Sequence, residues 1–182
     1  MDIFSAILIL KIVLAAAIIV GLIFFFLAAC SIYTNLTTGV PWAKIPKENI
    51  DRIFKEIGLP RNSRLYDLGC GDGRVIFMAE KYGYRAVGYE LSLYPYLKAR
   101  FRKFIFQSAA TVRRKNFFGE NLSQADAVFI FLVGKVMGRL GRKLEAELRK
   151  GAIVVSYGFI IPGWRPEKTI FTKPSLTYIY KK

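Results

Sequence analysis

Apolar residues dominate the first 33 positions of the chain. Residues 12–33, IVLAAAIIVGLIFFFLAACSIY, contain no charged side chain, and residues 3–10 are also almost entirely apolar. As a helix rising about 1.5 Å per residue, this segment is long enough to cross a hydrocarbon core about 30 Å thick. The alternative is a buried core helix, but such helices rarely run this long without a polar residue. We therefore expect one N-terminal transmembrane helix within an anchor of residues 1–33.

The pattern changes at Lys47, where Ile50, Ile53, Phe54 and Ile57 recur at helical spacing. Beyond this helix, short apolar runs alternate with helical patterns. We expect strands at 64–68, 86–90, 111–115, 127–132 and 152–157, helices at 73–82, 95–106 and 138–150, and a hairpin over 169–180. This alternation indicates an α/β fold with a mostly parallel twisted sheet, covered on both faces, and a C-terminal antiparallel hairpin. The basic third strand is expected at a solvent-facing edge.

The predicted organisation is an anchor (1–33), a linker (34–46) that lacks helical periodicity, and one domain (47–182). The chain has 28 basic and 13 acidic residues. Removing Lys11 and Asp2 leaves 27 and 12, so the part from Lys44 onward carries the whole net charge of +15. Such a surface attracts nucleic acid, acidic lipid headgroups or acidic proteins.

Histidine is absent, which removes histidine-based triads and most zinc sites. The two cysteines, Cys30 and Cys70, lie in the apolar segment and in a glycine-rich stretch, and we do not expect them to pair. A reducing compartment fits this usage, and no metal is expected.

The orientation of the anchor follows from the charges around it. Lys44, Lys47, Arg52 and Lys55 follow the apolar segment closely, whereas the short N-terminal side is nearly neutral. The positive-inside rule then places the domain in the cytoplasm, as part of a single-pass membrane protein. A cleaved signal peptide would have a more basic start. A second alternative is a bacterial lipoprotein box at residues 27–30, Leu-Ala-Ala-Cys, which would lipidate Cys30.

Three glycines at alternate positions follow the strand at 64–68, in the stretch DLGCGDG. Glycines in this number indicate an unusual backbone path that passes close to a ligand. In a parallel sheet, this place lies beyond the carboxyl ends of the strands, where ligands bind. Glu90 ends the next strand, and its carboxylate can accept hydrogen bonds from the two vicinal hydroxyls of a ribose. A nucleoside ligand is therefore expected.

The dinucleotide fingerprint G-x-G-x-x-G fails here, because Arg74 stands at its last position. The stretch instead resembles motif I of class I S-adenosylmethionine-dependent methyltransferases. That resemblance implies a Rossmann-like methyltransferase fold, a supporting role for Asp67, and a ribose-binding role for Glu90. It also implies that the amino-acid part of S-adenosylmethionine is bound by the loop residues Gly69, Cys70, Gly71, Asp72 and Gly73.

Further stretches are similar to a narrower family, which contains the ATP synthase c-subunit lysine N-methyltransferases and an archaeal protein lysine methyltransferase. They are GVPWAKIP, LYDLGCGDGRV, AVGYEL, FFGENLSQADAVFIF and the pattern F-x-x-P-x-W-x-P-E. The resemblance covers about residues 39–182. It implies protein lysine N-methylation by in-line transfer without a dedicated base, at a domain tethered to the membrane.

The same resemblance suggests roles for further residues. Asn116 replaces the family's usual aspartate near the adenine amino group, and Phe117 follows it. Candidates for the border of the acceptor channel are Trp42, Tyr66, Phe159 and Trp164. No catalytic residue is assigned.

Other acceptors remain open at this point. A domain at the bilayer could methylate lipids or small molecules, or it could bind the cofactor as a non-catalytic scaffold. The basic segments 100–103, 113–115 and 139–143 fit a nucleic-acid footprint, but beside an anchor we favour attraction to anionic lipid headgroups. The stretch FLVGKVM also lacks the Asn/Asp-Pro-Pro-aromatic motif of amino-methylating nucleic-acid enzymes.

Overall fold

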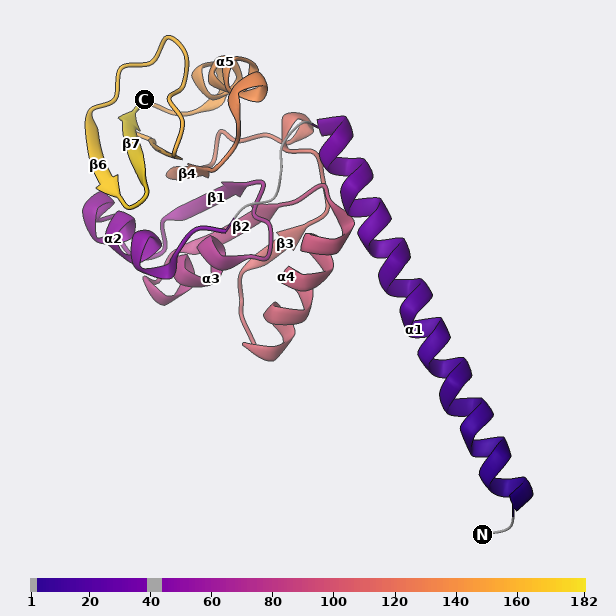
Figure 1. The fold of residues 1–182 in the computed structure, drawn as a ribbon. Coiled ribbons are helices and arrows are strands. Elements are labelled where there is room, and N and C mark those ends of the chain that lie inside the picture. Colours follow the sequence, from indigo (N-terminus) through magenta and orange to yellow (C-terminus); the bar gives the residue numbers. More distant parts are fainter. Residues whose placement is uncertain (1–2, 39–43) are drawn as a thin grey trace.

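A seven-stranded twisted sheet forms the centre of the computed structural model, which describes residues 3–38 and 44–182 (Figure 1). The strand order is β3-β2-β1-β4-β5-β7-β6. The strands are β1 (Arg64–Leu68), β2 (Arg85–Tyr89), β3 (Thr111–Arg113), β4 (Ala127–Ile130), β5 (Ile153–Tyr157), β6 (Lys168–Thr172) and β7 (Ser175–Lys181). Strands β1 to β5 run parallel, and β7 runs antiparallel to both β5 and β6. The predicted α/β fold with a closing hairpin is confirmed.

Helices cover both faces of this sheet. They are α2 (Lys47–Ile57), α3 (Arg74–Lys81), α4 (Leu93–Ile105) and α5 (Met137–Glu147), with short 3-10 turns η1 (Phe117–Gly119) and η2 (Gly134–Val136). Helices α2, α3 and α4 contribute to one core, and α5 packs into the other. The four predicted helices are present, whereas the two 3-10 turns were not predicted.

The two cores are separated by the alternation of side chains along each strand. In β1, Leu65 belongs to the core under α2 and α3, and Tyr66 belongs to the core under α5. In β4, Phe129 and Val128 divide in the same way. Burial on both faces explains why these strands read as nearly continuous apolar runs.

Strand β3 lies at one end of the strand order, which confirms the predicted solvent-facing edge. Its Arg113 is exposed and lies 3.6 Å from the carboxylate of Glu120. An edge strand tolerates such a side chain, because one of its sides is not paired with another strand.

Helix α1 (Ile3–Thr38) extends away from the domain (Figure 1). Its residues 3–30 have a mean hydropathy of 3.0, and none of the most apolar window is buried. The helix is thus long and apolar enough to cross a membrane, and it is not a core helix of the domain. It continues to Thr38, five residues into the segment expected to be a linker.

Gly88 in β2 allows the close packing of the sheet against the glycine loop. A Cβ atom at this position would lie 2.6 Å from Sγ and 2.8 Å from Cβ of Cys70. We expect Gly88→Ala to lower the free energy of unfolding by about 1–3 kcal/mol, because the buried Cys70 must shift. Denaturant titration of the full chain in detergent micelles measures the change.

Gly138→Ala is the matched control for this substitution. Gly138 lies in α5, and nothing comes within 4 Å of a Cβ placed there. This variant should be as stable as the parent or slightly more stable, since alanine favours a helix. Equal effects of the two substitutions would contradict the packing account.

Candidate functional site

The candidate site lies where the strand order reverses. Strand β1 pairs with β2 on one side and with β4 on the other. The loops that follow these parallel strands leave from the same edge of the sheet, and ligands of such folds bind in the crevice at this reversal. Residues 69–73, which link β1 to α3, therefore lie at the place where the sequence predicted a nucleoside site.

The glycine loop follows a path that requires glycine. Gly69, Gly71 and Gly73 have φ angles of +84°, +54° and +83°, which side chains disfavour. The backbone N–H groups of Gly69 and Cys70 both donate to the carbonyl of Tyr89, each at 2.9 Å. These two hydrogen bonds attach the loop to the last residue of β2. Because glycine has no side chain, a ligand can approach the loop backbone closely at these positions.

Glu90 holds the same loop from the neighbouring strand. Its Oε2 accepts a hydrogen bond from the N–H of Gly71 at 2.9 Å, and its Oε1 accepts one from the N–H of Ser92 at 2.7 Å. The side chain is buried, with 8% exposure. Burial raises the pKa of Glu90, although both of these hydrogen bonds oppose the shift. Each carboxylate oxygen has a further lone pair that can accept from a ligand hydroxyl.

Asp67 is a buried carboxylate that lacks full compensation. Its Oδ2 has no hydrogen-bond partner among the residues that the structure describes. Burial raises the pKa of Asp67 well above its ordinary value, and the negative charges of Glu90 and Asp72 raise it further. A cationic ligand beside this carboxyl would relieve the cost of its ionisation. S-adenosylmethionine carries an ammonium and a sulfonium, so the residues present fit this cofactor.

Asp72 in the loop is neutralised by two arginines. Its Oδ2 lies 2.8 Å from Nη1 of Arg102, and its Oδ1 lies 3.1 Å from Nε of Arg74. Sequence analysis assigned Arg102 to a basic surface segment and missed this contact. The contact joins helix α4 to the glycine loop. No motif or residue spacing in the sequence predicts it, because the two residues are far apart along the chain.

Cys70 contributes structure to the loop and not a reactive thiolate. The residue is buried, and burial raises the pKa of its thiol well above the ordinary value. The nearby charges of Asp67 and Glu90 raise it further. A small cavity behind the loop is also lined by Ile45, Phe129 and Phe131, which sequence analysis did not single out.

The predicted adenine-side residues lie beyond β3. Asn116 is exposed, and its Oδ1 accepts a hydrogen bond from the N–H of Phe118 at 3.0 Å, which begins the turn η1. The rings of Phe117 and Phe118 pack at a tilt of 39°, with centroids 4.6 Å apart. The Asn116 oxygen has a second lone pair, so it remains able to accept from a ligand amino group.

The structure describes three of the four aromatic channel candidates. Phe159 follows β5 at the same edge of the sheet as the glycine loop, and its carbonyl accepts from the Ser156 hydroxyl at 2.6 Å. Tyr66 is buried in the core under α5, with its ring 5.9 Å from that of Tyr89. Trp42 lies outside the described residues.

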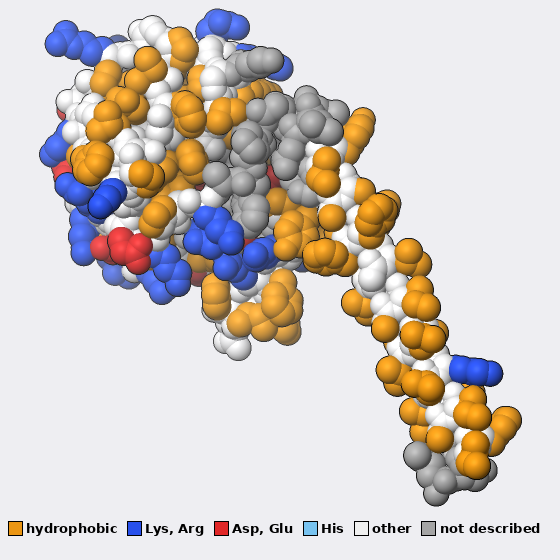
Figure 2. Space-filling model, viewed as in Figure 1, with side chains coloured by type: hydrophobic (Ala, Val, Ile, Leu, Met, Phe, Trp, Pro, Cys, Tyr) orange, Lys and Arg blue, Asp and Glu red, His pale blue; other side chains and the backbone are white. Residues whose placement is uncertain are grey.

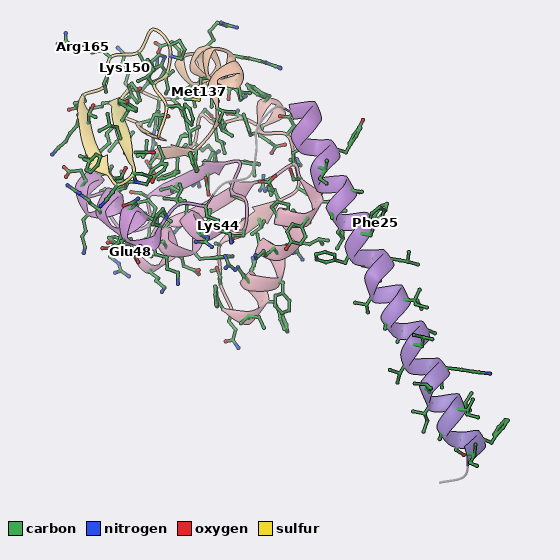
Figure 3. All side chains as sticks on the ribbon, in the orientation of Figure 1. Phe25, Lys44, Glu48, Met137, Lys150 and Arg165 are labelled. Atoms are coloured by element: carbon green, nitrogen blue, oxygen red, sulfur yellow. The ribbon has the colours of Figure 1, made fainter. Side chains whose placement is uncertain are left out.

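Trp164 lies on the α5 side of the sheet. Its ring packs 5.7 Å from that of Tyr180, in a groove that it shares with Lys150, Arg165 and Lys181. The groove is lined by Gly138 near the start of α5 and by Lys181, which pairs with the first residue of β5, so it extends along α5. Figure 3 shows Lys150 and Arg165 on the side of the domain away from α1. No residue of the glycine loop lines this groove.

Comparison with known proteins agrees with this geometry. The family model of the ANTKMT methyltransferase domain matches residues 67–168, from the buried Asp67 to the start of β6. The chain belongs to the ANTKMT methyltransferase family. It is therefore an enzyme that transfers a methyl group from S-adenosylmethionine. This cofactor is a cationic ligand of the kind that the buried Asp67 fits.

Members of the ANTKMT family and other relatives differ in their named acceptors. A protein-lysine N-methyltransferase of Saccharolobus islandicus is 36% identical over 72% of the chain and 84% of that protein. The ATP synthase c-subunit lysine N-methyltransferase of Mus musculus is 34% identical over 71% of the chain. A Salinibacter ruber RNA methyltransferase, solved with S-adenosyl-L-homocysteine, has a TM-score of 0.72 and 30% identity, covering 76% of the chain and 93% of that structure. The chain spans 52% of the mouse protein's length.

The raised pKa of Asp67 predicts how stability depends on pH in this ANTKMT-family domain. The folded chain holds the Asp67 proton more tightly than the unfolded chain, so the stabilisation is complete below the ordinary value of 3.8 and is lost as the pH rises. Asp67→Asn cannot ionise. The parent's free energy of unfolding should therefore fall, relative to this variant, as the pH rises above about 4. Denaturant titrations at several pH values measure this difference.

Asp51→Asn provides a control of opposite sign. Hydrogen bonds from Lys55 and Tyr82 lower the pKa of Asp51, so its stabilisation is present above 3.8 and is lost as the pH falls. Parallel pH profiles of the parent and Asp67→Asn would contradict the account of the buried carboxyl.

Proposed function

We propose that the chain is a membrane-anchored, S-adenosylmethionine-dependent protein lysine N-methyltransferase. The observation that carries this proposal is the left-handed glycine loop, tied to the end of β2 and braced by the carboxylate of Glu90. The relatives named for lysine methylation, of which the archaeal one is matched over most of its length, support the choice of acceptor.

In this proposal, the cofactor lies across the glycine loop. Glu90 binds the ribose hydroxyls with its free lone pairs, and the loop of residues 69–73 holds the amino-acid part. Asp67 meets the cationic end of the cofactor, which accounts for a buried Oδ2 that has no hydrogen-bond partner among the described residues. Asn116 and Phe117 lie beside the adenine. These roles are consistent with the position of each residue at the carboxyl edge of the sheet.

The chemistry requires alignment more than acid–base catalysis. When bound, the cofactor supplies a methyl group already activated by the sulfonium. The chain's own residues orient donor and acceptor, which contributes about 7–11 kcal/mol in well-aligned reactions. A lysine has an ordinary pKa near 10.4, and removing its proton at pH 7 costs about 4–5 kcal/mol. An apolar border that includes Phe159 lowers this cost by disfavouring the charged form, and water takes the proton.

Helix α1 is proposed as a single transmembrane anchor, with the domain of residues 47–182 in the cytoplasm. The exposed apolar surface of α1 and the cations that follow it support this arrangement. Anionic lipid headgroups would attract the basic domain, although several of its cations already have partners within the chain. Lys115, for example, lies 2.8 Å from Glu120, and Lys143 pairs with Glu147.

A lipid or small-molecule acceptor is the second candidate, because a domain at the bilayer can reach such compounds. The Salinibacter relative raises the further possibility of an RNA acceptor for this chain, and the net charge favours it. Against RNA, β4 is followed by FLVGKVM, which lacks the motif of amino-methylating nucleic-acid enzymes. A non-catalytic scaffold does not account for the family match.

Methyl-labelled S-adenosylmethionine separates these acceptors. We expect the full chain, in detergent or nanodiscs with membranes of its source cell, to label protein, and hydrolysis to release methyl-lysine. Label in the solvent-extractable lipid or in nuclease-sensitive material would contradict the proposal. The readout is scintillation counting of each fraction, followed by amino-acid analysis.

Glu90→Gln tests the assigned cofactor contacts. Glutamine keeps the size of the side chain but offers one acceptor oxygen in place of two, so the loop and the cofactor lose charge-assisted hydrogen bonds. We expect the Kd for S-adenosyl-L-homocysteine, measured by calorimetry, to rise about 10- to 100-fold. Glu56→Gln is the control, because Glu56 pairs with Lys168 away from the loop. Unchanged affinity in a folded Glu90→Gln variant would overturn the assignment.

The anchor predicts the behaviour of the chain in membranes. The chain should remain in the pellet after carbonate extraction, and its mass should include the residues before Cys30. In spheroplasts of an expressing bacterium, added protease should digest the domain only after the membrane is opened. A lipid-modified chain that begins at Cys30, and whose processing Cys30→Ala blocks, would instead establish a lipoprotein.

A further inference from the structure

The outer face of helix α4 is unusually apolar for a surface helix. Phe101, Phe104 and Phe106 are 65%, 79% and 61% exposed, and Ile105 and Leu97 are also exposed. Single exposed apolar residues are common, but a contiguous group of large ones marks a binding surface. Because these residues occupy one helix and the turn that ends it, they form one patch, which we call the α4 apolar face.

Cations flank the α4 apolar face. A groove of about 520 Å³ at the end of α4 is lined by Arg100, Lys103, Phe104, Ile105, Gln107 and Ser108. Arg100 is exposed, and the Lys103 ammonium donates one hydrogen bond to the Ala110 carbonyl, leaving further donors. A groove lined by both cations and large apolar side chains matches an anionic phospholipid.

The position of α4 beside α1 favours a bilayer over other partners. The two helices contact each other, and Leu27, Ala28 and Cys30 of α1 are less exposed than residues 7–26. Figure 1 shows α4 running beside the domain end of α1. In Figure 2, hydrophobic side chains gather at the end of α4, below lysine and arginine side chains, on the side from which α1 extends. The two apolar surfaces are therefore neighbours.

We propose that the α4 apolar face inserts into the interface of the same bilayer that α1 spans, with Arg100 and Lys103 at anionic headgroups. This inference rests on the proposed membrane anchor. A helix with large apolar side chains on one face and cations beside them is the type that lies in a membrane interface. The domain is then held at two places, by a spanning helix and by an in-plane helix, and cannot rotate freely about α1.

The same helix is joined to the cofactor loop. On its other side, Arg102 lies 2.8 Å from Asp72 of the glycine loop. At its start, the N–H of Ser92 donates to Glu90. Seating α4 on the bilayer therefore fixes the orientation of the loop relative to the membrane surface. The acceptor that this arrangement selects is a lysine of a membrane protein, close to the headgroups.

Quenching by brominated phospholipids tests the insertion directly. The full chain carrying Phe104→Trp is placed in nanodiscs that contain phosphatidylglycerol with or without brominated acyl chains. The matched control is Phe171→Trp, because Phe171 is 55% exposed on β6, at the other end of the sheet. Both variants retain the two native tryptophans, so the parent is subtracted. The emission added at position 104 should fall about twofold with bromine, and that added at 171 should stay unchanged.

Equal quenching at positions 104 and 171 would overturn the proposal, as would a second copy of the chain found to cover α4 in the nanodisc. This readout needs no methyl transfer, so its result is independent of the enzymatic proposal.

The proposed insertion also predicts a change in activity. The double variant Phe101→Ser/Phe104→Ser should lose about tenfold in methylation of a membrane-embedded lysine and retain its rate on a soluble lysine peptide. Equal losses on both acceptors would contradict a role in membrane orientation.

Discussion

The attachment of the glycine loop to the end of β2 is the constraint on which the site depends. Two loop N–H groups share the carbonyl of Tyr89, and a third reaches the carboxylate of Glu90. Strand β2 is itself fixed by its parallel pairing with β1 and β3, so the loop inherits the rigidity of the sheet. A binding loop that is held before its ligand arrives loses less conformational freedom on binding. This explains why such a mobile residue as glycine can build a defined site.

Burial of acidic side chains makes this site locally destabilising for the fold. The carboxyl of Asp67 is buried near two further acidic residues, and one of its oxygens has no hydrogen-bond partner among the described residues. Two arginines neutralise Asp72, but Asp67 has no such partner among the described residues. Unfavourable groups of this kind cluster at functional sites, where a ligand compensates them. A cofactor that carries positive charge explains why the Asp67 carboxyl is buried, which packing alone does not explain.

Sequence reasoning succeeded where local chemistry decides the structure. The alternation of apolar runs predicted the sheet, the charge of TVRRKN predicted its edge, and the glycine spacing predicted the loop after β1. It failed where distant segments meet. Trp164 packs against Tyr180 in a groove along α5, and Arg102 of α4 reaches Asp72 of the glycine loop. Neither contact has a periodic signal, because each depends on how separate elements are packed.

The central claim is that a nucleoside binds between the glycine loop and Glu90. The most direct measurement is a crystal structure of the full chain grown with S-adenosyl-L-homocysteine. The account predicts density for the ligand against residues 69–73, with the ribose hydroxyls within hydrogen-bond distance of Glu90. Ligand density elsewhere on the domain, with Glu90 making no contact to it, would contradict the account.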